Sequence, residues 1–212
     1  MTRGTRIPCI CPVRVRFPTV RRKTPAAHPA WHNGRMPTLR VLTVCTGNIC
    51  RSPAAAVMLR EAVRAEGLSE QVEVESAGTS WDADGLPMDE RTMFALERAG
   101  YRQPFEHTAR TVHLSELTTW DLVLVMTAQH LQSLRRMMEQ IPEGQASPEV
   151  LLWRQFDPET SIDARDEDLD VPDPWYDEQE AFDETVLGMQ RAVPSIMAHV
   201  RRLLREGRDR TR

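Results

Sequence analysis

The chain has 212 residues, of which 27 are Lys or Arg and 31 are Asp or Glu, and its net charge is −4 at neutral pH. This length suffices for one substantial hydrophobic core, whereas no apolar run is long enough for a transmembrane helix or a signal peptide. With only four cysteines, the composition argues against a disulfide-stapled secreted scaffold, so we expect a cytoplasmic protein with no membrane partner.

Residues 1–36 differ from the rest of the chain in charge and composition. They contain eight basic residues, five prolines and no Asp or Glu, whereas the remainder carries a net charge of −12. We expect this extension to be disordered, because it cannot bury a core. Three interpretations of this extension compete: a basic arm for nucleic acid or another acidic partner, a targeting segment, or a stretch upstream of a true start at Met36. We favour the third interpretation. Nucleic acid is therefore not an expected partner of the domain over residues 37–206, which a basic tail follows over residues 207–212.

The first predicted element of the domain is a buried strand over residues 39–44, which is short, aliphatic and rich in β-branched residues. A helix follows and ends near Gly67, with Ser52 as its predicted N-cap and Pro53 as its first residue. Residues 45–51 therefore form a strand-to-helix loop, called the phosphate loop below. The backbone N–H groups of such a loop and the helix N-terminus can together cradle a dianion.

Cys45 and Arg51 give the phosphate loop its predicted chemistry. A thiolate at a helix N-terminus beside a guanidinium is stabilised relative to the thiol, so Cys45 should be a nucleophile at neutral pH. The guanidinium group of Arg51 is planar and permanently charged, and it can donate hydrogen bonds to two phosphate oxygens. A structural cysteine near an unrelated arginine would show the same spacing, but the preceding strand, Gly47, Ser52 and Pro53 favour a phosphate site.

The rest of the chain alternates strands with helices. We predict strands over residues 71–76, 121–126 and 150–153, and helices over residues 89–97, 128–140 and 178–205. Gly188 and Pro194 predict a kink or a break near residue 190 of the last helix. This order predicts a single doubly wound α/β domain with a mainly parallel four-stranded sheet flanked by helices. Such sheets bind ligands at the carboxyl ends of their strands, where the phosphate loop would lie.

An acidic stretch over residues 163–177 contains a candidate proton donor. An alkoxide or phenoxide that leaves phosphorus needs a proton, which a nearby carboxylic acid can supply. Asp173 is the candidate, because Pro174 stiffens the chain behind it and two aromatic residues, Trp175 and Tyr176, could line a slot for an aromatic leaving group. An ordinary turn with aromatic anchors would show the same pattern, and the other carboxylates are expected to be solvated.

Residues 45–53, Cys-Thr-Gly-Asn-Ile-Cys-Arg-Ser-Pro, resemble the signature of the low-molecular-weight protein tyrosine phosphatases of bacterial type. The further matches, in the family's order, are Ser76–Thr79, His107–Arg110, Asp121–Met126 and Asp173–Tyr176. The resemblance covers residues 38–206. It implies a phosphoric monoester hydrolase that acts on phosphotyrosine in proteins and on small aryl phosphates through a cysteinyl-phosphate intermediate. Inorganic phosphate or another oxyanion would be its product or inhibitor, and no cofactor is implied.

The resemblance also assigns roles within the site. Cys45 is the implied nucleophile, Arg51 binds the phosphate and Asp173 is the general acid. The other implied phosphate-binding residues are Thr46, Gly47, Asn48, Ile49, Cys50 and Ser52. Asn48 and Ser76 resemble a pair that braces the loop by side-chain hydrogen bonds, with Asn48 tolerating a left-handed backbone. The Ser52 hydroxyl could donate a hydrogen bond to the departing Cys45 thiolate.

The expected substrate cleft is partly aromatic. Trp81, Trp175 and Tyr176 would form its walls, although Trp81 stands one residue earlier than in many bacterial members of the family and could instead anchor its own loop. In this family a threonine at the position of Ile49 goes with a preference for phosphoarginine. The isoleucine therefore favours phosphotyrosine.

Two alternatives concern the cysteines. Cys50 is either a small buried residue or a partner that closes a reversible disulfide with Cys45 under peroxide, as is known in the family. Arsenate reduction is the rival activity on the same fold, because arsenate mimics phosphate. The thioredoxin-coupled arsenate reductases need two further cysteines on a later segment, and no cysteine follows Cys50 in this chain. This activity is therefore disfavoured.

The histidines of the chain show no zinc-ligand spacing, and the Cys-x4-Cys pair is explained by the phosphate loop, so we expect no metal site. His107 and Arg110 are interpreted as structural residues of the sheet and its hydrogen bonds rather than as catalytic residues. No metal is needed for the two-step mechanism that the resemblance implies.

Overall fold

The computed structural model of the protein describes residues 39–209. The predicted extension over residues 1–36 lies outside the described residues, and so does the hypothesis that it binds an acidic partner. Residues 210–212 of the predicted basic tail lie outside them as well. Residues 207–209 belong to the last helix rather than to a separate tail.

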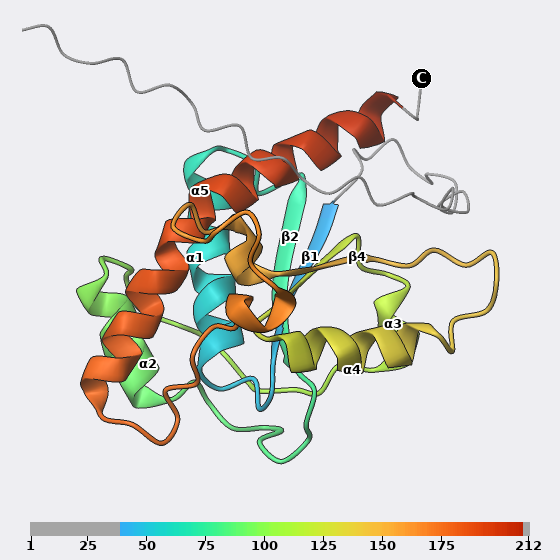
Figure 1. Ribbon diagram of the computed structural model, residues 1–212. Helices are drawn as coiled ribbons and strands as arrows, with labels where there is room; N and C mark the ends of the chain where they lie inside the picture. The colour runs from blue at the N-terminus through green and yellow to red at the C-terminus, as the bar shows by residue number, and fades with distance from the viewer. Residues whose placement is uncertain (1–38, 210–212) are drawn as a thin grey trace, which may run out of the picture.

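The described chain alternates strands with helices, as predicted, and two short 3-10 turns precede the last helix. The strands are β1 (Leu39–Cys45), β2 (Val72–Gly78), β3 (Leu122–Val125) and β4 (Glu149–Leu152). The α-helices are α1 (Arg51–Ala65), α2 (Glu90–Arg98), α3 (Leu114–Leu117), α4 (Ala128–Met138) and α5 (Gln179–Asp209), and the 3-10 turns are Trp153–Phe156 and Asp166–Leu169. Figure 1 shows their arrangement.

The four strands form one parallel sheet in the order β2-β1-β3-β4. In the register of this sheet, Val44 of β1 lies between Ala77 of β2 and Val125 of β3, and Cys45 faces Gly78. All strand pairs among the described residues are parallel, so their carboxyl ends meet at one edge of the sheet. The prediction of a doubly wound α/β domain with a parallel four-stranded sheet is confirmed.

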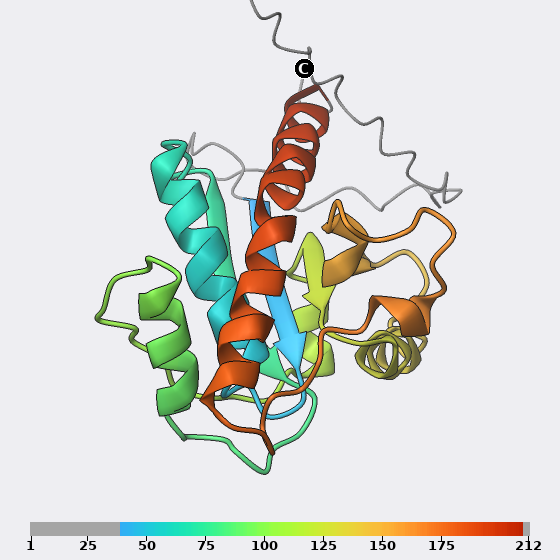
Figure 2. The same cartoon turned by 60° about the vertical axis from the view of Figure 1, so that its left-hand side comes forward.

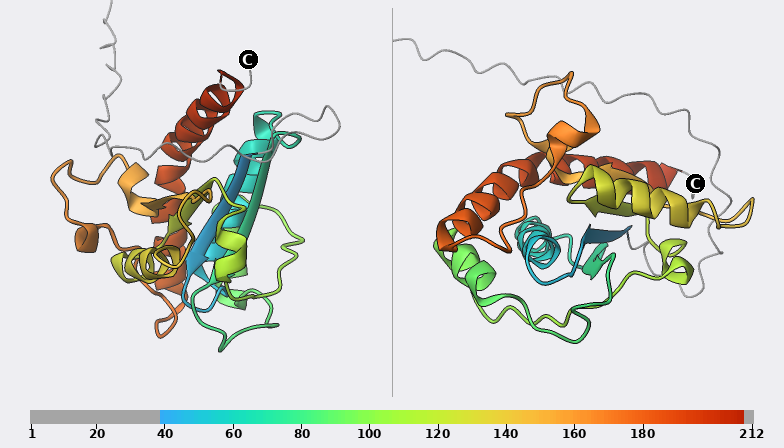
Figure 3. Two further views of the ribbon diagram at one scale, coloured as in Figure 1. Left: turned by 90° about the vertical axis from the view of Figure 1, so that its right-hand side faces the viewer. Right: turned by 60° about the horizontal axis from the view of Figure 1, so that its bottom comes forward.

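Alternate residues of the central strand pack on opposite faces of the sheet. Val41 and Cys45 belong to a buried cluster shared with α1, α2 and α5, whereas Leu42 and Val44 belong to a second cluster with α3 and α4. Figure 3 shows α1 and α3 on opposite sides of the strands. Burial on both faces explains why the strands are nearly continuous apolar runs and why they could be found from the sequence.

The start of α1 differs from the prediction by two residues. The helix begins at Arg51 and its N-cap is Cys50, which makes no capping side-chain hydrogen bond, so the assignment of Ser52 as N-cap is wrong. The Ser52 hydroxyl is buried and bonds instead to the phosphate loop and to β2. Pro53 still lies in the first helical turn, where its missing N–H costs no intrahelical bond.

The last helix, α5, contains Pro194 but is continuous over its whole length, so the predicted break is not found. Figure 1 shows that the helix changes direction along its course, in agreement with the predicted kink. Along its course the helix contacts α1, α2 and the 3-10 turn over Trp153–Phe156.

Three segments meet at the carboxyl edge of the sheet: the phosphate loop, residues 79–89, and residues 170–178, which we call the acid loop (Figure 2). Main-chain hydrogen bonds join them to the strands and to one another. The Thr79 N–H donates to the Cys45 carbonyl oxygen at 2.9 Å, and the Val171 N–H donates to the Met126 carbonyl oxygen at 2.8 Å. The edge that was expected to bind ligands is therefore built from segments distant in sequence.

Gly78, at the end of β2, permits the phosphate loop to approach the sheet. A Cβ atom here would stand 2.4 Å from the Thr46 carbonyl oxygen. We expect Gly78→Ala to lower the free energy of unfolding by about 2 kcal/mol, measured by urea titration, because the loop must move away. The control is Gly188→Ala in α5, whose Cβ would lie 3.8 Å from the Arg191 side chain and which should be neutral or stabilising. Equal stability of the two variants would contradict this explanation.

Candidate active site

The phosphate loop turns through Asn48, which is buried and has a positive φ of 57°. Its carbonyl oxygen accepts a hydrogen bond from His107 Nε2 at 2.6 Å, and its side-chain Oδ1 accepts one from the Arg110 N–H at 3.0 Å. Asn48 Nδ2 donates to Ser52 Oγ at 2.9 Å. His107 and Arg110, expected to be structural residues of the sheet, thus hold the phosphate loop itself.

Asn48 and Ser76 were predicted to brace the loop together, and the bracing role of Ser76 stays a prediction. Among the described residues, the hydrogen bonds of the Asn48 side chain go to Ser52 and Arg110, and none joins it to Ser76. Ser76 is buried in β2, where it lies beside Thr43 of β1. The positive φ of Asn48 agrees with its predicted backbone, but the partners of its side chain depend on a loop 62 positions later and could not be derived from spacing.

Cys45 lies at the end of β1 and is 3% exposed, with its Sγ 3.0 Å from Ser52 Oγ. The Ser52 hydroxyl also lies 3.2 Å from the Ala77 carbonyl oxygen, to which it can donate. A hydroxyl has one proton, so it donates either to this carbonyl or to the sulfur. When Cys45 is a thiol it can donate to Ser52, and when it is a thiolate the hydroxyl can turn towards it while Asn48 continues to donate to Ser52 Oγ.

The guanidinium of Arg51 connects the phosphate loop to the acid loop. Its side chain is 5% exposed, and it forms an ion pair with Asp173 and donates from Nη1 to the Val171 carbonyl oxygen at 3.2 Å. Arg51 Nε is buried and has no hydrogen-bond partner among the described residues. The ion pair brings the predicted acid to the predicted phosphate-binding residue. The Nε–H group remains available to donate a hydrogen bond to a bound oxyanion.

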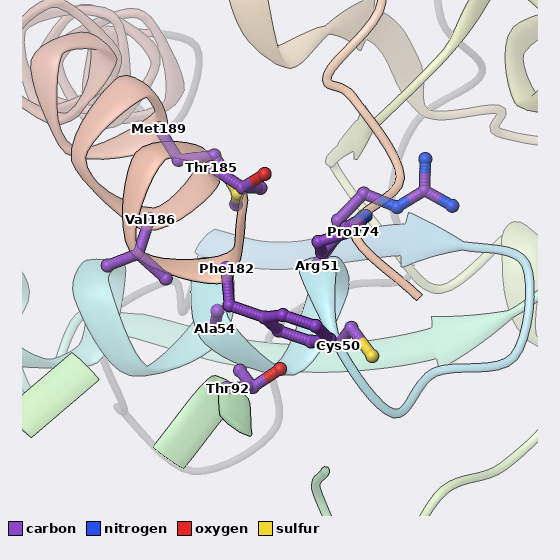
Figure 4. A pocket seen from close by; sticks show the side chains of 9 residues that line it. All are labelled: Cys50, Arg51, Ala54, Thr92, Pro174, Phe182, Thr185, Val186 and Met189. Atoms are coloured by element: carbon purple, nitrogen blue, oxygen red, sulfur yellow. The ribbon is translucent and has the colours of Figure 1, made fainter. Parts of the chain in front are cut away.

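Cys50 is the N-cap of α1 and is buried in the same apolar cluster as Cys45. Burial raises the pKa of the Cys50 thiol to about 12, so it is protonated at neutral pH. Figure 4 shows its sulfur beside Thr92 of α2 and the ring of Phe182 of α5, at a small cavity that Pro174 of the acid loop also lines. Both Cys45 and Cys50 are free thiols. The reversible disulfide between them stays a prediction.

His130 of α4 is a residue of this site that the sequence analysis did not identify. Its ring lies 2.9 Å from Thr46 Oγ1 through Nε2 and 2.8 Å from Thr127 Oγ1 through Nδ1, and Thr127 is the N-cap of α4. Burial, and secondarily the charge of Arg51, lower the pKa of His130 to about 4. The neutral imidazole therefore ties the phosphate loop to α4. A threonine three residues before a histidine at a predicted helix start was the available signal.

Comparison with known proteins places this geometry in a family. The family model for "Low molecular weight phosphotyrosine protein phosphatase" matches residues 40–206. These residues include both loops of the site and all four strands except Leu39, the first residue of β1. The chain belongs to this family. The resemblance predicted from residues 45–53 and 173–176 is thereby confirmed.

Relatives of this low molecular weight phosphatase cover most of the chain. It is 39% identical over 171 residues to the low molecular weight protein-tyrosine-phosphatase of Streptomyces coelicolor, covering 81% of this chain and 98% of that protein. It is 36% identical over 149 residues to the human low molecular weight phosphotyrosine protein phosphatase, covering 70% of this chain and 87% of the human protein. The crystal structure of YfkJ from Bacillus subtilis superposes with a TM-score of 0.66 at 29% identity, covering 80% of this chain and 98% of that one.

The aromatic residues expected to wall the substrate cleft of this phosphatase are exposed to different degrees. Trp81, in the segment over residues 79–89, is 75% exposed and Tyr176 is 92% exposed, so both lie largely in solvent. Trp175 is partly covered, because the Arg91 guanidinium lies over its ring with Cζ 5.5 Å from the ring centroid. Their contact with a substrate stays a prediction.

Metal ligands and membrane-spanning segments were sought in the same part of the chain. Within residues 39–209, no group of three or more His, Cys, Asp or Glu side chains is placed to hold a metal ion. None of the helices described there combines the length and the apolar character that crossing a membrane requires.

The buried imidazole of His130 makes the stability of this phosphatase depend on pH. Its pKa lies near 4 in the folded state and near 6.5 when exposed, so the unfolded chain binds a proton between these values that the folded protein does not. The contribution of His130 is therefore fully present above pH 6.5 and is lost as the pH falls towards 4. Compared with the parent, His130→Asn should lose less stability between pH 7 and pH 4.5, by on the order of 2 kcal/mol in urea titrations.

The control for this pH dependence is His113→Asn, at an exposed position before α3. The free energy of unfolding of this variant should decrease as the pH is lowered by the same amount as that of the parent. Parallel curves for the parent and His130→Asn would show that His130 is not held neutral by burial.

Proposed function

We propose that the protein hydrolyses phosphotyrosine in proteins, with Cys45 as the nucleophile, Arg51 as the phosphate-binding residue and Asp173 as the general acid and base. One observation carries these roles. The buried arginine of the loop that also contains Cys45 holds the carboxylate of Asp173 and keeps Nε without a partner among the described residues. A phosphate monoester bound to Arg51 would have the sulfur on one side and the carboxylate near its leaving oxygen, as displacement at phosphorus requires.

The first step transfers the phosphoryl group to sulfur. The Cys45 thiolate attacks phosphorus, the P–S bond forms and the bond from phosphorus to the phenolic oxygen breaks. Asp173 gives its proton to that oxygen, so that tyrosine leaves as a neutral phenol. A bound phosphate draws the donors of Arg51 to itself, which frees Asp173 from the ion pair to serve the leaving group. Arg51 and the backbone N–H groups of the phosphate loop stabilise the charge on the remaining oxygens.

The second step releases phosphate. Asp173, now a carboxylate, takes a proton from water as the water oxygen attacks phosphorus, and the P–S bond breaks. Inorganic phosphate leaves, and Cys45 returns to the thiolate. The Ser52 hydroxyl, 3.0 Å from Sγ, turns from the Ala77 carbonyl to the thiolate and stabilises it as a leaving group. Atoms and protons balance over the two steps, with water as the only co-reactant.

The proposed substrate follows from the borders of the site. Trp175 and Tyr176 follow the acid on the same loop, so an aromatic leaving group would meet aromatic surface there. Ile49 packs against the apolar cluster of α1 and α5. It lacks the hydroxyl of the threonine that goes with a preference for phosphoarginine in this family, so it favours phosphotyrosine. We also place the protein in the cytoplasm, because a site with two free thiols, Cys45 and Cys50, is suited to a reducing compartment.

Release of inorganic phosphate from a phosphotyrosine peptide tests these roles. Cys45→Ser should abolish turnover, and Asp173→Ala should lower kcat/KM by about 10²- to 10⁴-fold, because the leaving oxygen loses its proton donor. The matched control is Asp163→Ala, an exposed carboxylate of the same acidic stretch, which should leave turnover unchanged. Unchanged turnover in Cys45→Ser would falsify the mechanism, and arsenate reduction without phosphatase activity would favour the rival enzyme.

A further inference from the structure

Arg91, in the first turn of α2, lies between the phosphate loop and the acid loop. On the side of the phosphate loop it is held by Asp89, the N-cap of α2. The Asp89 N–H donates to the Ile49 carbonyl oxygen at 2.9 Å, and its carboxylate accepts hydrogen bonds from Arg91 Nε at 3.1 Å and from Nη2 at 3.0 Å. The Arg91 guanidinium is therefore fixed relative to the phosphate loop through one residue.

On its other side, Arg91 holds the chain that follows Asp173. Its Nη1 donates to the Asp177 carbonyl oxygen at 3.0 Å and its Nη2 donates to the Trp175 carbonyl oxygen at 3.4 Å. In the reverse direction, Gln179 Nε2 at the start of α5 donates to the Arg91 carbonyl oxygen at 2.9 Å. Arg91 is thus joined by hydrogen bonds both to the acid loop and to the start of α5, which follows that loop.

The Arg91 guanidinium stacks on a buried aromatic ring. Its Cζ lies 4.3 Å from the centroid of the Phe182 ring, and this ring is buried. Figure 4 shows Phe182 packed between α2 and α1, beside Thr92 and Cys50. An arginine stacked on such a ring has little freedom left to lose when it forms its hydrogen bonds.

We propose that Arg91 is a positioning residue for the general acid: it holds the acid loop at a fixed place relative to the phosphate loop, so that Asp173 meets the leaving oxygen. This inference rests on the proposed function. Arg154 bonds to the first residue of the acid loop, where its Nη1 donates to the Asp170 carbonyl oxygen at 3.0 Å. Arg51 and Arg91 hold the later part of the loop, and they differ in what competes for them. Substrate phosphate competes for Arg51, whereas the donors of Arg91 face main-chain carbonyls outside the phosphate loop. Arg91 therefore keeps the loop in place when Arg51 turns to the substrate.

Dependence of the rate on the leaving group distinguishes positioning of the acid from general support of the fold. A nitrophenolate leaves without a proton, whereas phenolate needs one, so a misplaced acid slows the second substrate far more than the first. We expect Arg91→Ala to lower kcat/KM by about tenfold with phenyl phosphate and by no more than about twofold with para-nitrophenyl phosphate. Arg91→Lys should give a smaller loss of the same kind, because an ammonium cannot contact both carbonyls and stack on the ring.

The matched control is Arg98→Ala on the same helix. Arg98 is ion-paired with Asp183 of α5, so it joins α2 to α5 without touching the acid loop. Its kcat/KM should change by the same small factor with both substrates. Asp89→Asn is a second test variant, because asparagine preserves the helix cap but removes the charge that holds Arg91; it should resemble a weaker Arg91→Ala.

Combination with Asp173→Ala completes the test. If Arg91 acts through the acid, the variant that carries both Arg91→Ala and Asp173→Ala should have the same ratio of kcat/KM values for the two substrates as Asp173→Ala alone. Equal losses with both substrates in Arg91→Ala, or additive losses in the double variant, would overturn the inference. Since the parent and Asp173→Ala are measured in the same series, failure of the proposed function would be seen separately, as a parent without turnover or an Asp173 variant without leaving-group dependence.

Discussion

The site depends on the burial of one permanent positive charge. Arg51 cannot lose its proton, and a buried guanidinium without partners would cost several kcal/mol, so the fold must bring acceptors to it. It does so with Asp173 and the Val171 carbonyl, which lie 122 and 120 positions later in the chain. The acid loop is consequently held against the phosphate loop by the same group that is proposed to bind the substrate. In the proposed mechanism phosphate and Asp173 compete for this guanidinium, so that substrate binding and release of the acid would be one event.

The remaining contacts hold the two loops independently of Arg51, which the proposed mechanism requires to change partners. His107 and Arg110 hold Asn48, His130 holds Thr46, and Asp89 ties Ile49 to Arg91. Each of these groups lies on a strand end or a helix start around the carboxyl edge of the sheet, or in the segment between β2 and α3. Hydrogen-bond donors fixed in this way need not reorganise as charge develops on phosphorus, which is the main source of stabilisation in such sites.

The parts of the site that are local in sequence were predictable. The buried strand before Cys45, the loop to Arg51 and the alternation of strands and helices follow from patterns of a few residues. The partners of Asn48, the roles of His130 and Arg91 and the true start of α1 were not predictable, because each depends on side chains brought together by tertiary packing. Ser52 illustrates the conflict: its residue type favours an N-cap, but the hydroxyl is bonded to Cys45, Asn48 and Ala77 in the core. Pro194 likewise lies inside α5 without ending it, in a helix that packs on both α1 and α2.

Trapping of the intermediate tests the central claim most directly. Asp173→Asn cannot activate water, so the phosphoenzyme should accumulate when this variant is mixed with para-nitrophenyl phosphate and quenched. Fragmentation mass spectrometry of the peptide between Arg40 and Arg51 should then place the phosphoryl group on Cys45. A phosphoryl group on Cys50, or release of phosphate with no phosphorylated peptide, would contradict the account.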